Sequence, residues 1–427
     1  MDVTISPASR LEGVVRIPGD KSISHRYAML AGIAEGPSRL HNFSTGADPH
    51  STLGCMEALG VRVERDSEGA IVVHGNGLDG LTAPANELDA GNSGSTIRML
   101  SGILAAQPFE SRIGGDESLS KRPMERIMKP LAQMGATLKA RDGKYPPLEI
   151  QGGKLSPIDY KLPVASAQVK SCVLFAGLYA EGTTIVREPI RTRDHSEIAL
   201  REFGAEVQSA GGVISIEGRP KLQGRQLLVP GDLSSAAFFL AACMVVPGSR
   251  LILSGVGLNP TRAALIDFLI LLGARIKVLS IEQSGGELIG NLEVQAGKLT
   301  GGVLEGANTA AMIDEVPVLA VLGALSENGL TVKDAGELRV KETDRIATVA
   351  DNFTRMGVKI DVAPDGFHVP GGQKFRSAHV DSFGDHRIAM ACAVAALAAE
   401  GDVTISNAEA ASVSFPEFWS LLESIRV

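Results

Sequence analysis

The sequence predicts an α/β protein in which six related units of strands and helices are divided between two domains. Three elements recur along the chain: a short strand after a turn, an amphipathic helix that ends in glycine, and a nearly all-apolar helix. Internal repetition at a fixed period indicates an architecture built from repeated structural units. With 427 residues, six units have about 71 residues each. Helices and strands that recur in this way form layers around a shared core.

The short strand follows a turn that in most copies contains glycine. The last four of these glycines are separated by 66, 81 and 72 residues, which fits a repeating unit of constant size. The predicted copies are Gly36–Phe43, Phe109–Ile113, Gly182–Val186, Gly248–Leu253, Gly329–Val332 and Gly401–Ile405.

The amphipathic helix ends in a glycine and continues into a predicted hairpin. A glycine after the last helical residue fits the C′ position, which requires a positive φ. Alternating apolar residues after it indicate a half-buried strand. A sixth copy, Phe418–Val427, is truncated. Together the recurring elements predict that a complete unit has the order strand, helix, strand, helix, hairpin. The five complete copies contain Gly60, Gly135, Gly204, Gly273 and Gly357.

Six nearly all-apolar helices begin with polar residues. A helix that is apolar on every side must be buried, so we expect three of them at the centre of each domain. Ser, Asp and Asn at their starts are typical N-caps. The predicted ranges are Ser22–Ala34, Ser93–Ala106, Ser166–Ala180, Ser234–Val246, Asp314–Ser326 and Asp385–Ala399.

Two similar segments mark the expected domain boundaries. Val229-Pro-Gly-Asp232, before the fourth apolar helix, resembles Ile17-Pro-Gly-Asp20 near the start of the chain. We interpret both segments as crossings between domains. The first domain is therefore predicted at 19–228, and the second at 1–18 together with 229–427.

Composition excludes several classes of function. The 41 Lys and Arg against 49 Asp and Glu produce a formal net charge of −8, which disfavours coating a nucleic acid. Aromatic residues make up only 4% of the chain, which disfavours base-stacking platforms. The longest apolar runs, Ala236–Val246 and Ala389–Ala399, are shorter than the roughly 20 residues that a membrane span needs. We expect no nucleic-acid partner and no membrane partner.

Cysteine usage and the first residues indicate the compartment. The start of the chain lacks the basic and apolar regions of a signal peptide, so none is expected. The cysteines lie far apart without a C-x-x-C motif or a histidine cluster, which indicates buried, reduced thiols and a cytoplasmic location. We therefore expect no metal ion and no cofactor. The four cysteines are Cys55, Cys172, Cys243 and Cys392.

Charged residues gather at the starts of the apolar helices and in nearby loops. Helix N-termini present unpaired N–H groups and a partial positive charge, so added cations there favour a bound anion. Taken singly, each cation could be a solvated surface charge, Gly91–Ser95 a capping turn and Asp314 an N-cap. Their recurrence in several units favours an anion site. The set comprises Lys21, Arg26, Arg98, Lys121, Arg122, Lys170, Arg191, Arg193, Lys341, Glu342, Asp344, Arg345, His386 and Arg387.

Six motifs in order along the whole chain resemble the 5-enolpyruvylshikimate-3-phosphate synthase family. They are Gly19-Asp-Lys21-Ser22-Ile-Ser-His-Arg26, Gly91-Asn92-Ser-Gly94-Ser95-Thr-Ile-Arg98, Leu119-Ser-Lys-Arg122-Pro, Ser166-Ala167-Gln168-Val-Lys, Arg339-Val-Lys341-Glu342-Thr-Asp-Arg345 and Gly384-Asp-His-Arg387. The resemblance implies the two-domain enolpyruvyl transferase fold, an inside-out α/β barrel with three βαβαββ units per domain. It also implies transfer of the enolpyruvyl group of phosphoenolpyruvate to the 5-hydroxyl of shikimate 3-phosphate, without a cofactor and by a monomer.

The resemblance also implies a role for each matching residue. Asp314 would be the general base, and Glu342, with Lys21 or Lys341, would protonate the methylene carbon of phosphoenolpyruvate. The first domain would mainly bind shikimate 3-phosphate, and the second would carry the base and part of the phosphoenolpyruvate site. Shikimate 3-phosphate would contact Lys21, Ser22, Arg26, Ser166, Ala167, Gln168, Arg193, Asp314 and Lys341; phosphoenolpyruvate would contact Lys21, Gly94, Arg122, Gln168, Arg345 and Arg387.

Departures from one family branch point to the second, glyphosate-tolerant type. Ala167 stands where the first branch has serine, and Ser412–Pro416 lacks the lysine that the first branch has in this segment. Gly94 stands where the tolerant members have alanine.

Three other functions remain as alternatives. UDP-N-acetylglucosamine enolpyruvyl transferase has the same fold, but it has a cysteine in the loop that corresponds to Gly114–Pro123, which here has none. RNA 3′-phosphate cyclase, with related units, fits a net acidic chain poorly. A non-catalytic repeat scaffold would need no convergence of cations.

Overall fold

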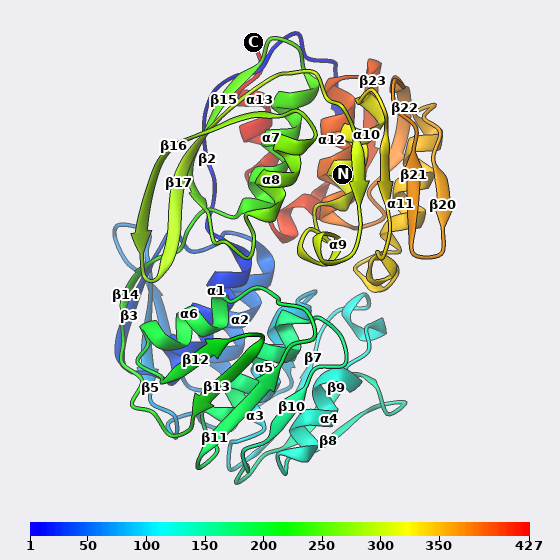
Figure 1. The fold of residues 1–427 in the computed structure, drawn as a ribbon. Helices are drawn as coiled ribbons and strands as arrows, with labels where there is room; N and C mark the ends of the chain where they lie inside the picture. The colour runs from blue at the N-terminus through cyan, green and yellow to red at the C-terminus, as the bar shows by residue number, and fades with distance from the viewer. The chain divides into compact units, whose positions relative to one another are not determined.

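The structure of the chain, a computed structural model, describes residues 1–427 (Figure 1). The chain divides into two compact units. The first unit contains Gly19–Val229 and Gln283–Glu287. The second unit contains Met1–Pro18, Pro230–Glu282 and Leu288–Val427.

The first unit contains three four-stranded sheets with one common topology. In each sheet a parallel edge strand is followed by two antiparallel pairings. The last strand of the unit, β14, completes the first sheet, so the unit closes on itself. The sheets are β14 (Gln226–Leu228), β3 (Glu35–His41), β5 (Ile71–Asn76), β4 (Arg62–Arg65); β6 (Leu88–Asp89), β7 (Glu110–Gly114), β9 (Tyr145–Gln151), β8 (Thr137–Arg141); and β10 (Asp159–Lys161), β11 (Thr183–Arg187), β13 (Val213–Glu217), β12 (Val207–Ala210).

The second unit also contains three sheets, and the start of the chain completes two of them. β2 is the parallel edge strand beside β15, and β1 pairs antiparallel with β23 in place of the hairpin missing from the truncated sixth copy. The sheets are β2 (Glu12–Arg16), β15 (Arg250–Gly257), β17 (Glu287–Gln295), β16 (Arg275–Ser284); β18 (Gly302–Leu304), β19 (Leu330–Val332), β21 (Gly366–Val369), β20 (Asp361–Ala363); and β22 (Arg376–Asp381), β23 (Glu400–Ser406), β1 (Val3–Ile5).

Three apolar helices lie at the centre of each unit, as the sequence predicts. Almost every residue of these helices is buried, because their apolar residues cover all sides and need protein contacts all round. Figure 1 shows α7, α10 and α12 side by side, and all three contact one another. The central helices are α1 (Lys21–Ile33), α3 (Gly94–Leu104), α5 (Ala167–Gly177), α7 (Leu233–Val245), α10 (Val316–Leu325) and α12 (His386–Leu397).

The amphipathic helices end at the predicted glycines. Each of the five glycines follows the C-cap residue and has a φ between 77° and 108°, a conformation that side chains with a Cβ disfavour. These helices are α2 (Ala47–Ala58), α4 (Glu125–Gln133), α6 (His195–Glu202), α8 (Ala264–Leu271) and α11 (Arg345–Arg355). Shorter helices are α9 (Ala307–Ala311), α13 (Phe418–Ser424), η1 (Leu119–Lys121), η2 (Gly336–Val340) and η3 (Ala408–Val413).

The starts of three central helices differ from the prediction. Asp20 and Asp232 cap α1 and α7, so these helices begin one residue before the predicted Ser22 and Ser234. An aspartate just before these serines can accept a backbone hydrogen bond in the first turn, which fixes the start there. The third helix that differs is α10, which begins at Val316 instead of Asp314, and no side chain caps it. The interpretation of Asp314 as a simple N-cap is therefore wrong.

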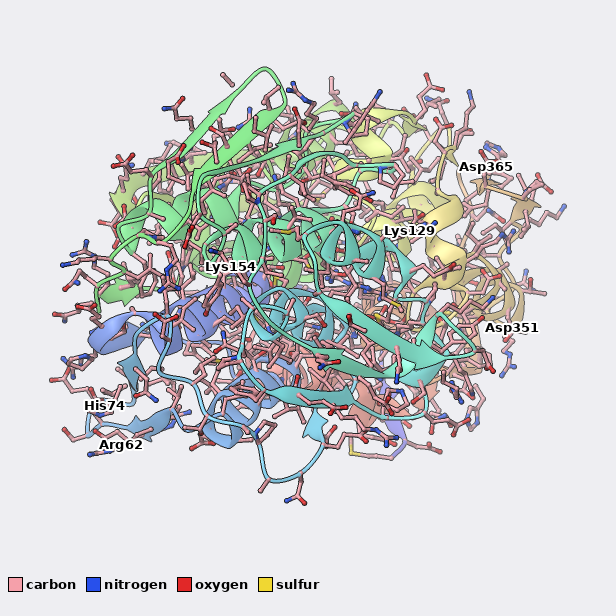
Figure 2. All side chains as sticks on the ribbon, turned by 90° about the horizontal axis from the view of Figure 1, so that it is seen from below. Arg62, His74, Lys129, Lys154, Asp351 and Asp365 are labelled. Atoms are coloured by element: carbon pink, nitrogen blue, oxygen red, sulfur yellow. The ribbon has the colours of Figure 1, made fainter.

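A surface cluster of charged residues and the buried cysteines show how polar and apolar side chains are distributed. Figure 2 shows Arg62 and His74 at the surface, where they lie opposite each other on β4 and β5 and both contact Glu64. The four cysteines are free and buried, as expected, and burial raises the pKa of Cys55 and of Cys392 to about 12. None of the helices combines the length and the apolar content that a bilayer span requires.

We expect Gly102→Ala to destabilise the protein by about 1–3 kcal/mol, because the new methyl group overlaps the backbone carbonyl oxygen of Cys172, where α3 and α5 pack closely. The matched control is Gly54→Ala in α2, where a methyl group meets no atom and is expected to stabilise by up to about 1 kcal/mol. Urea unfolding followed by circular dichroism measures both. Equal midpoints for the two variants would contradict the close packing of α3 on α5.

Candidate active site

Arg26 on α1 is a buried cation that is held by neutral groups. Its Nε donates to Ser196 Oγ at 2.6 Å, its Nη1 to the backbone oxygen of Ser22 at 2.7 Å and its Nη2 to Ser171 Oγ at 2.9 Å. Arg26 is only 3% exposed. Burial lowers its pKa to about 10, and repulsion from Arg193 contributes to that shift. A desolvated guanidinium without a carboxylate in contact favours an anionic ligand.

Lys21, the first residue of α1, lies five residues from Arg26 and forms an ion pair with Asp48. The lysine side chain is 18% exposed, whereas Asp48 is 5% exposed. An ammonium has three donors, so this pairing leaves Lys21 able to bind a further acceptor. The Oδ1 atom of Asp48 is buried and has no hydrogen-bond partner. Asp48 was not predicted as a site residue; the acidic residue in the first turn of α2 was the available signal.

The start of α3 brings two guanidinium groups close to Gly94. Arg122 is 7% exposed, and its Nη2 donates to Asn92 Oδ1 at 2.8 Å and to Ser118 Oγ at 3.0 Å. A methyl group on Gly94 would lie 2.7 Å from Nη1 of Arg98 and 3.5 Å from Nη1 of Arg122. A glycine at this position therefore leaves room for cations beside the helix start.

The start of α5 is hydrogen-bonded to the start of α3. Ser166 caps α5, and Ala167 is the first residue of the helix. Gln168 accepts from Nη1 of Arg98 at 2.7 Å and donates to Ser95 Oγ at 2.9 Å. These two bonds place the predicted contacts Ser166–Gln168 next to the cations at the start of α3.

Lys170, which the sequence placed among the cations for an anion site, is instead fully buried between carboxylates. Its Nζ lies 2.7 Å from Glu197 Oε1 and 3.2 Å from Glu188 Oε1. Glu188 also accepts from the backbone N–H of Thr192 at 3.2 Å. This ion triad ties α5 to the segment that carries Arg193. Sequence reasoning missed both glutamates, because one buried lysine in an apolar helix does not indicate its partners.

Two other expected cations are surface charges. Lys121 pairs with Glu117, and their side chains are 71% and 88% exposed. Arg191 is 69% exposed and pairs with Asp194. Exposed pairs of this kind contribute at most about 1 kcal/mol. At these positions the charge pattern indicates solvation rather than a binding site.

Arg345 is the centre of the charged cluster in the second unit. It is only 1% exposed, and it contacts Asp385 Oδ2 through Nε at 2.8 Å, Glu342 Oε2 through Nη2 at 2.6 Å and Asp314 Oδ1 through Nη1 at 3.4 Å. Burial alone would lower the pKa of Arg345, but attraction from Asp385 and Glu342 outweighs burial and raises it. Burial favours the neutral form of Asp385, but attraction from Arg345 outweighs burial and lowers the pKa of Asp385.

Asp314 lies between cations just before α10. Its Oδ1 is also 3.3 Å from Nζ of Lys341, and its backbone oxygen accepts from Nη1 of Arg387 at 2.9 Å. The carboxylate is 17% exposed, so it is partly accessible to a ligand. A carboxylate held in this way can accept a proton from a substrate when the surrounding cations rearrange. The second unit thus brings together the five predicted residues Asp314, Lys341, Glu342, Arg345 and Arg387.

The buried arginines of the two sets differ in how their charge is compensated. In the first unit, Arg26 is held by hydroxyl and carbonyl groups, which leaves its charge for an anion. In the second unit, Arg345 and Lys341 alternate with carboxylates, an arrangement suited to proton transfer. No group of three or more His, Cys, Asp or Glu side chains is arranged to hold a metal ion.

Comparison with known proteins assigns the chain to a family. The sequence profile described as EPSP synthase (3-phosphoshikimate 1-carboxyvinyltransferase) matches residues 5–422. This chain belongs to the EPSP synthase family. The relative from Solibacter usitatus (strain Ellin6076), a 3-phosphoshikimate 1-carboxyvinyltransferase, is 67% identical over 425 residues, and the match covers 100% of both chains. The relative of the same name from Koribacter versatilis (strain Ellin345) is 52% identical and 99% of each chain is covered.

Solved structures confirm the predicted fold. The EPSP synthase from Acinetobacter baumannii superposes with a TM-score of 0.89 at 42% identity and covers 100% of this chain and 98% of that chain. The enolpyruvyl transferase NikO from Streptomyces tendae has a TM-score of 0.78 at 19% identity over 99% of this chain and 96% of its own, which supports the fold alone. The two-domain enolpyruvyl transferase fold of the EPSP synthase family is therefore shown.

We expect Lys170→Met to destabilise the protein by about 3–5 kcal/mol, because it leaves the buried carboxylates of Glu188 and Glu197 without their cation. Lys154→Met is the matched control: Lys154, labelled in Figure 2, pairs with Glu181 at the surface and should change stability by less than about 1 kcal/mol. Urea unfolding at neutral pH measures the difference. A Lys170 variant as stable as the control would show that the triad contributes nothing.

Proposed function

We propose that the residues described above bind two small anionic substrates and move protons between them. The chain is a 3-phosphoshikimate 1-carboxyvinyltransferase. It transfers the enolpyruvyl group of phosphoenolpyruvate to the 5-hydroxyl of shikimate 3-phosphate and releases phosphate. The observation that carries the assignment of the site is Arg26, a buried cation on a family motif whose hydrogen bonds all go to neutral groups.

The residues proposed for shikimate 3-phosphate are mainly those at helix starts of the first unit. A phosphate and a carboxylate on one molecule need several cations and N–H donors, which a helix N-terminus supplies together with Lys21 and Arg26. Arg193 adds a cation near Arg26, as its effect on the pKa of Arg26 indicates. The proposed contacts are Lys21, Ser22, Arg26, Ser166, Ala167, Gln168 and Arg193, with Asp314 and Lys341 from the second unit.

Phosphoenolpyruvate is assigned to arginines of both units. Arg122, Arg345 and Arg387 offer planar donor pairs that match carboxylate and phosphate geometry, and Lys21, Gly94 and Gln168 complete the set. Carboxylates already contact Arg345, and we propose that a substrate anion displaces one of them, for which Glu342 and Asp314 are the partly exposed candidates. Binding at Arg345 is thus an exchange of one carboxylate for another.

This exchange prepares the proton transfers. Asp314 takes the proton of the 5-hydroxyl while the hydroxyl oxygen attacks C2 of phosphoenolpyruvate. The methylene carbon of phosphoenolpyruvate gains a proton from Glu342, Lys21 or Lys341. Loss of a methyl proton and of phosphate from the resulting tetrahedral intermediate restores the double bond. A Glu342 carboxyl displaced from Arg345 loses its nearest cation, so it holds a proton more readily and donates it to carbon.

Three further assignments accompany this function. The domain at 19–228 mainly binds shikimate 3-phosphate, whereas 1–18 with 229–427 carries the base and part of the phosphoenolpyruvate site. We propose that the enzyme acts as a monomer. The buried, free cysteines support a cytoplasmic location.

The direct test is phosphate release by the purified protein. With phosphoenolpyruvate and shikimate 3-phosphate, and without added metal or nucleotide, we expect steady release and formation of the enolpyruvyl ether. Replacing shikimate 3-phosphate with UDP-N-acetylglucosamine should abolish it. Turnover with the nucleotide sugar alone would overturn the assignment.

We expect Asp314→Asn to lower kcat by about 10²–10⁴-fold while the protein stays folded, because the amide cannot take the proton of the 5-hydroxyl. Asp351→Asn is the control: Asp351, labelled in Figure 2, pairs at the surface with Arg355 and should leave kcat unchanged. Steady-state kinetics and circular dichroism check both. A near-normal kcat in the Asp314 variant would remove this residue from its role.

We expect Gly94→Ala to raise KM for phosphoenolpyruvate about tenfold, because the methyl group forces the guanidinium of Arg98 to move and crowds Arg122. The KM for shikimate 3-phosphate should change less than about twofold, since Arg26 and its partners are untouched. Glyphosate titration of the same variant tests tolerance. We expect the variant to need a higher glyphosate concentration for half-inhibition than the wild-type protein. Equal increases in both KM values would contradict the separate assignments.

A further inference from the structure

The turn between β16 and β17 is a separate feature of the first unit. Gln283–Glu287 group with the first unit, although the rest of both strands belongs to the second unit. The chain therefore passes between the units at this turn as well as at Pro18–Gly19 and Val229–Pro230. No family motif or predicted site residue lies in this turn.

The turn makes a buried polar contact with α6. Glu287 Oε1 lies 2.7 Å from Nδ1 of His195, the first residue of α6. Both side chains are only 2% exposed. A carboxylate buried to this extent is kept only where polar groups hold it, so the contact fixes the turn and the helix start against each other.

Two glycines bring the turn close to the first unit, Gly286 against α6 and Gly285 against β14. Gly285 and Gly286 have φ values of 54° and 74°, which residues with a Cβ rarely adopt. A methyl group on Gly286 would lie 2.8 Å from Cγ2 of Ile198 on α6, and one on Gly285 would lie 3.0 Å from Cδ2 of Leu227. The backbone of the turn thus packs directly on the first unit without room for side chains.

Residues next to His195 in the chain orient the proposed shikimate 3-phosphate contacts Arg26 and Arg193. Ser196 accepts the bond from Nε of Arg26 at 2.6 Å, and Glu197 holds Lys170 at 2.7 Å. Arg193 lies two residues before His195. Glu287 is also among the carboxylates that oppose the burial-driven lowering of the pKa of Arg26. A shift of the first turn of α6 would therefore move the acceptor of Arg26 and the backbone that carries Arg193.

We propose that Glu287 is a positioning residue for shikimate 3-phosphate binding, which acts through His195 and the first turn of α6. This inference rests on the proposed function. Glu287 does not touch substrate. It holds His195, so that Ser196 keeps Arg26 oriented and Arg193 stays beside it. The strands of this hairpin belong to the second unit, but its turn helps to position the proposed binding residues of the first unit.

The test compares two glutamate-to-glutamine changes on the same hairpin. Glu287→Gln removes the buried charge and keeps the shape, whereas Glu282→Gln makes the same change at an exposed position. Calorimetry with shikimate 3-phosphate should show an approximately tenfold weaker Kd for Glu287→Gln and an unchanged Kd for Glu282→Gln. At saturating shikimate 3-phosphate, kcat should stay within about twofold of the wild-type value, as expected for a residue that only positions the binding groups.

A double-mutant cycle with His195→Asn identifies the route of the effect. If Glu287 acts through His195, the double variant should bind shikimate 3-phosphate no more weakly than the worse single variant. Additive losses would overturn the proposed route, and a lower melting temperature with unchanged Kd would overturn the positioning role. A wild-type protein that does not bind shikimate 3-phosphate would instead contradict the proposed function, so the two failures are distinguishable.

Discussion

The burial of six all-apolar helices is the constraint on which the rest of the structure depends. Such a helix cannot lie on a surface, so three of them fill the centre of each unit and the sheets surround them. Their polar starts must then end at the edge of a core, where N–H groups without helical partners need acceptors. Caps such as Asp20, Ser93 and Asp385 supply some of these acceptors. Anionic ligands complete the compensation in the function proposed for this enzyme.

The buried arginines of the two candidate sets, Arg26 and Arg345, are compensated differently. Arg26 has only hydroxyl and carbonyl partners, so its charge is available to a substrate anion. Arg345 is surrounded by the carboxylates of Asp385, Glu342 and Asp314. In the proposed mechanism a substrate anion displaces one of these carboxylates from Arg345, and the displaced carboxylate becomes a stronger base. Substrate binding and activation of the acid–base groups are thus one event in the proposed mechanism.

Support for the site comes from an ion triad and a histidine–carboxylate hydrogen bond, both buried and at a distance from the proposed substrates. Lys170 with Glu188 and Glu197, and His195 with Glu287, fix the two ends of the segment around Arg193. Breaking a buried pair is costly because it leaves an uncompensated charge in a medium that solvates it poorly. The segment is therefore held firmly although Arg193 itself lies in a loop, where backbone hydrogen bonds alone would permit movement.

Periodicity in the sequence determined the six units, the glycines that end the amphipathic helices and the burial of the central helices. These features depend on residues close in the chain, and the physical rules for them act locally. The family motifs predicted which residues form the candidate site. Partners far apart in the chain were decided only by the tertiary structure. Asp48 beside Lys21, the carboxylates around Lys170, the surface positions of Lys121 and Arg191, and the contact of Glu287 with His195 all depend on which elements pack together. A lone charged residue has the same local pattern whether it faces solvent or a buried partner, so only the fold distinguishes the two.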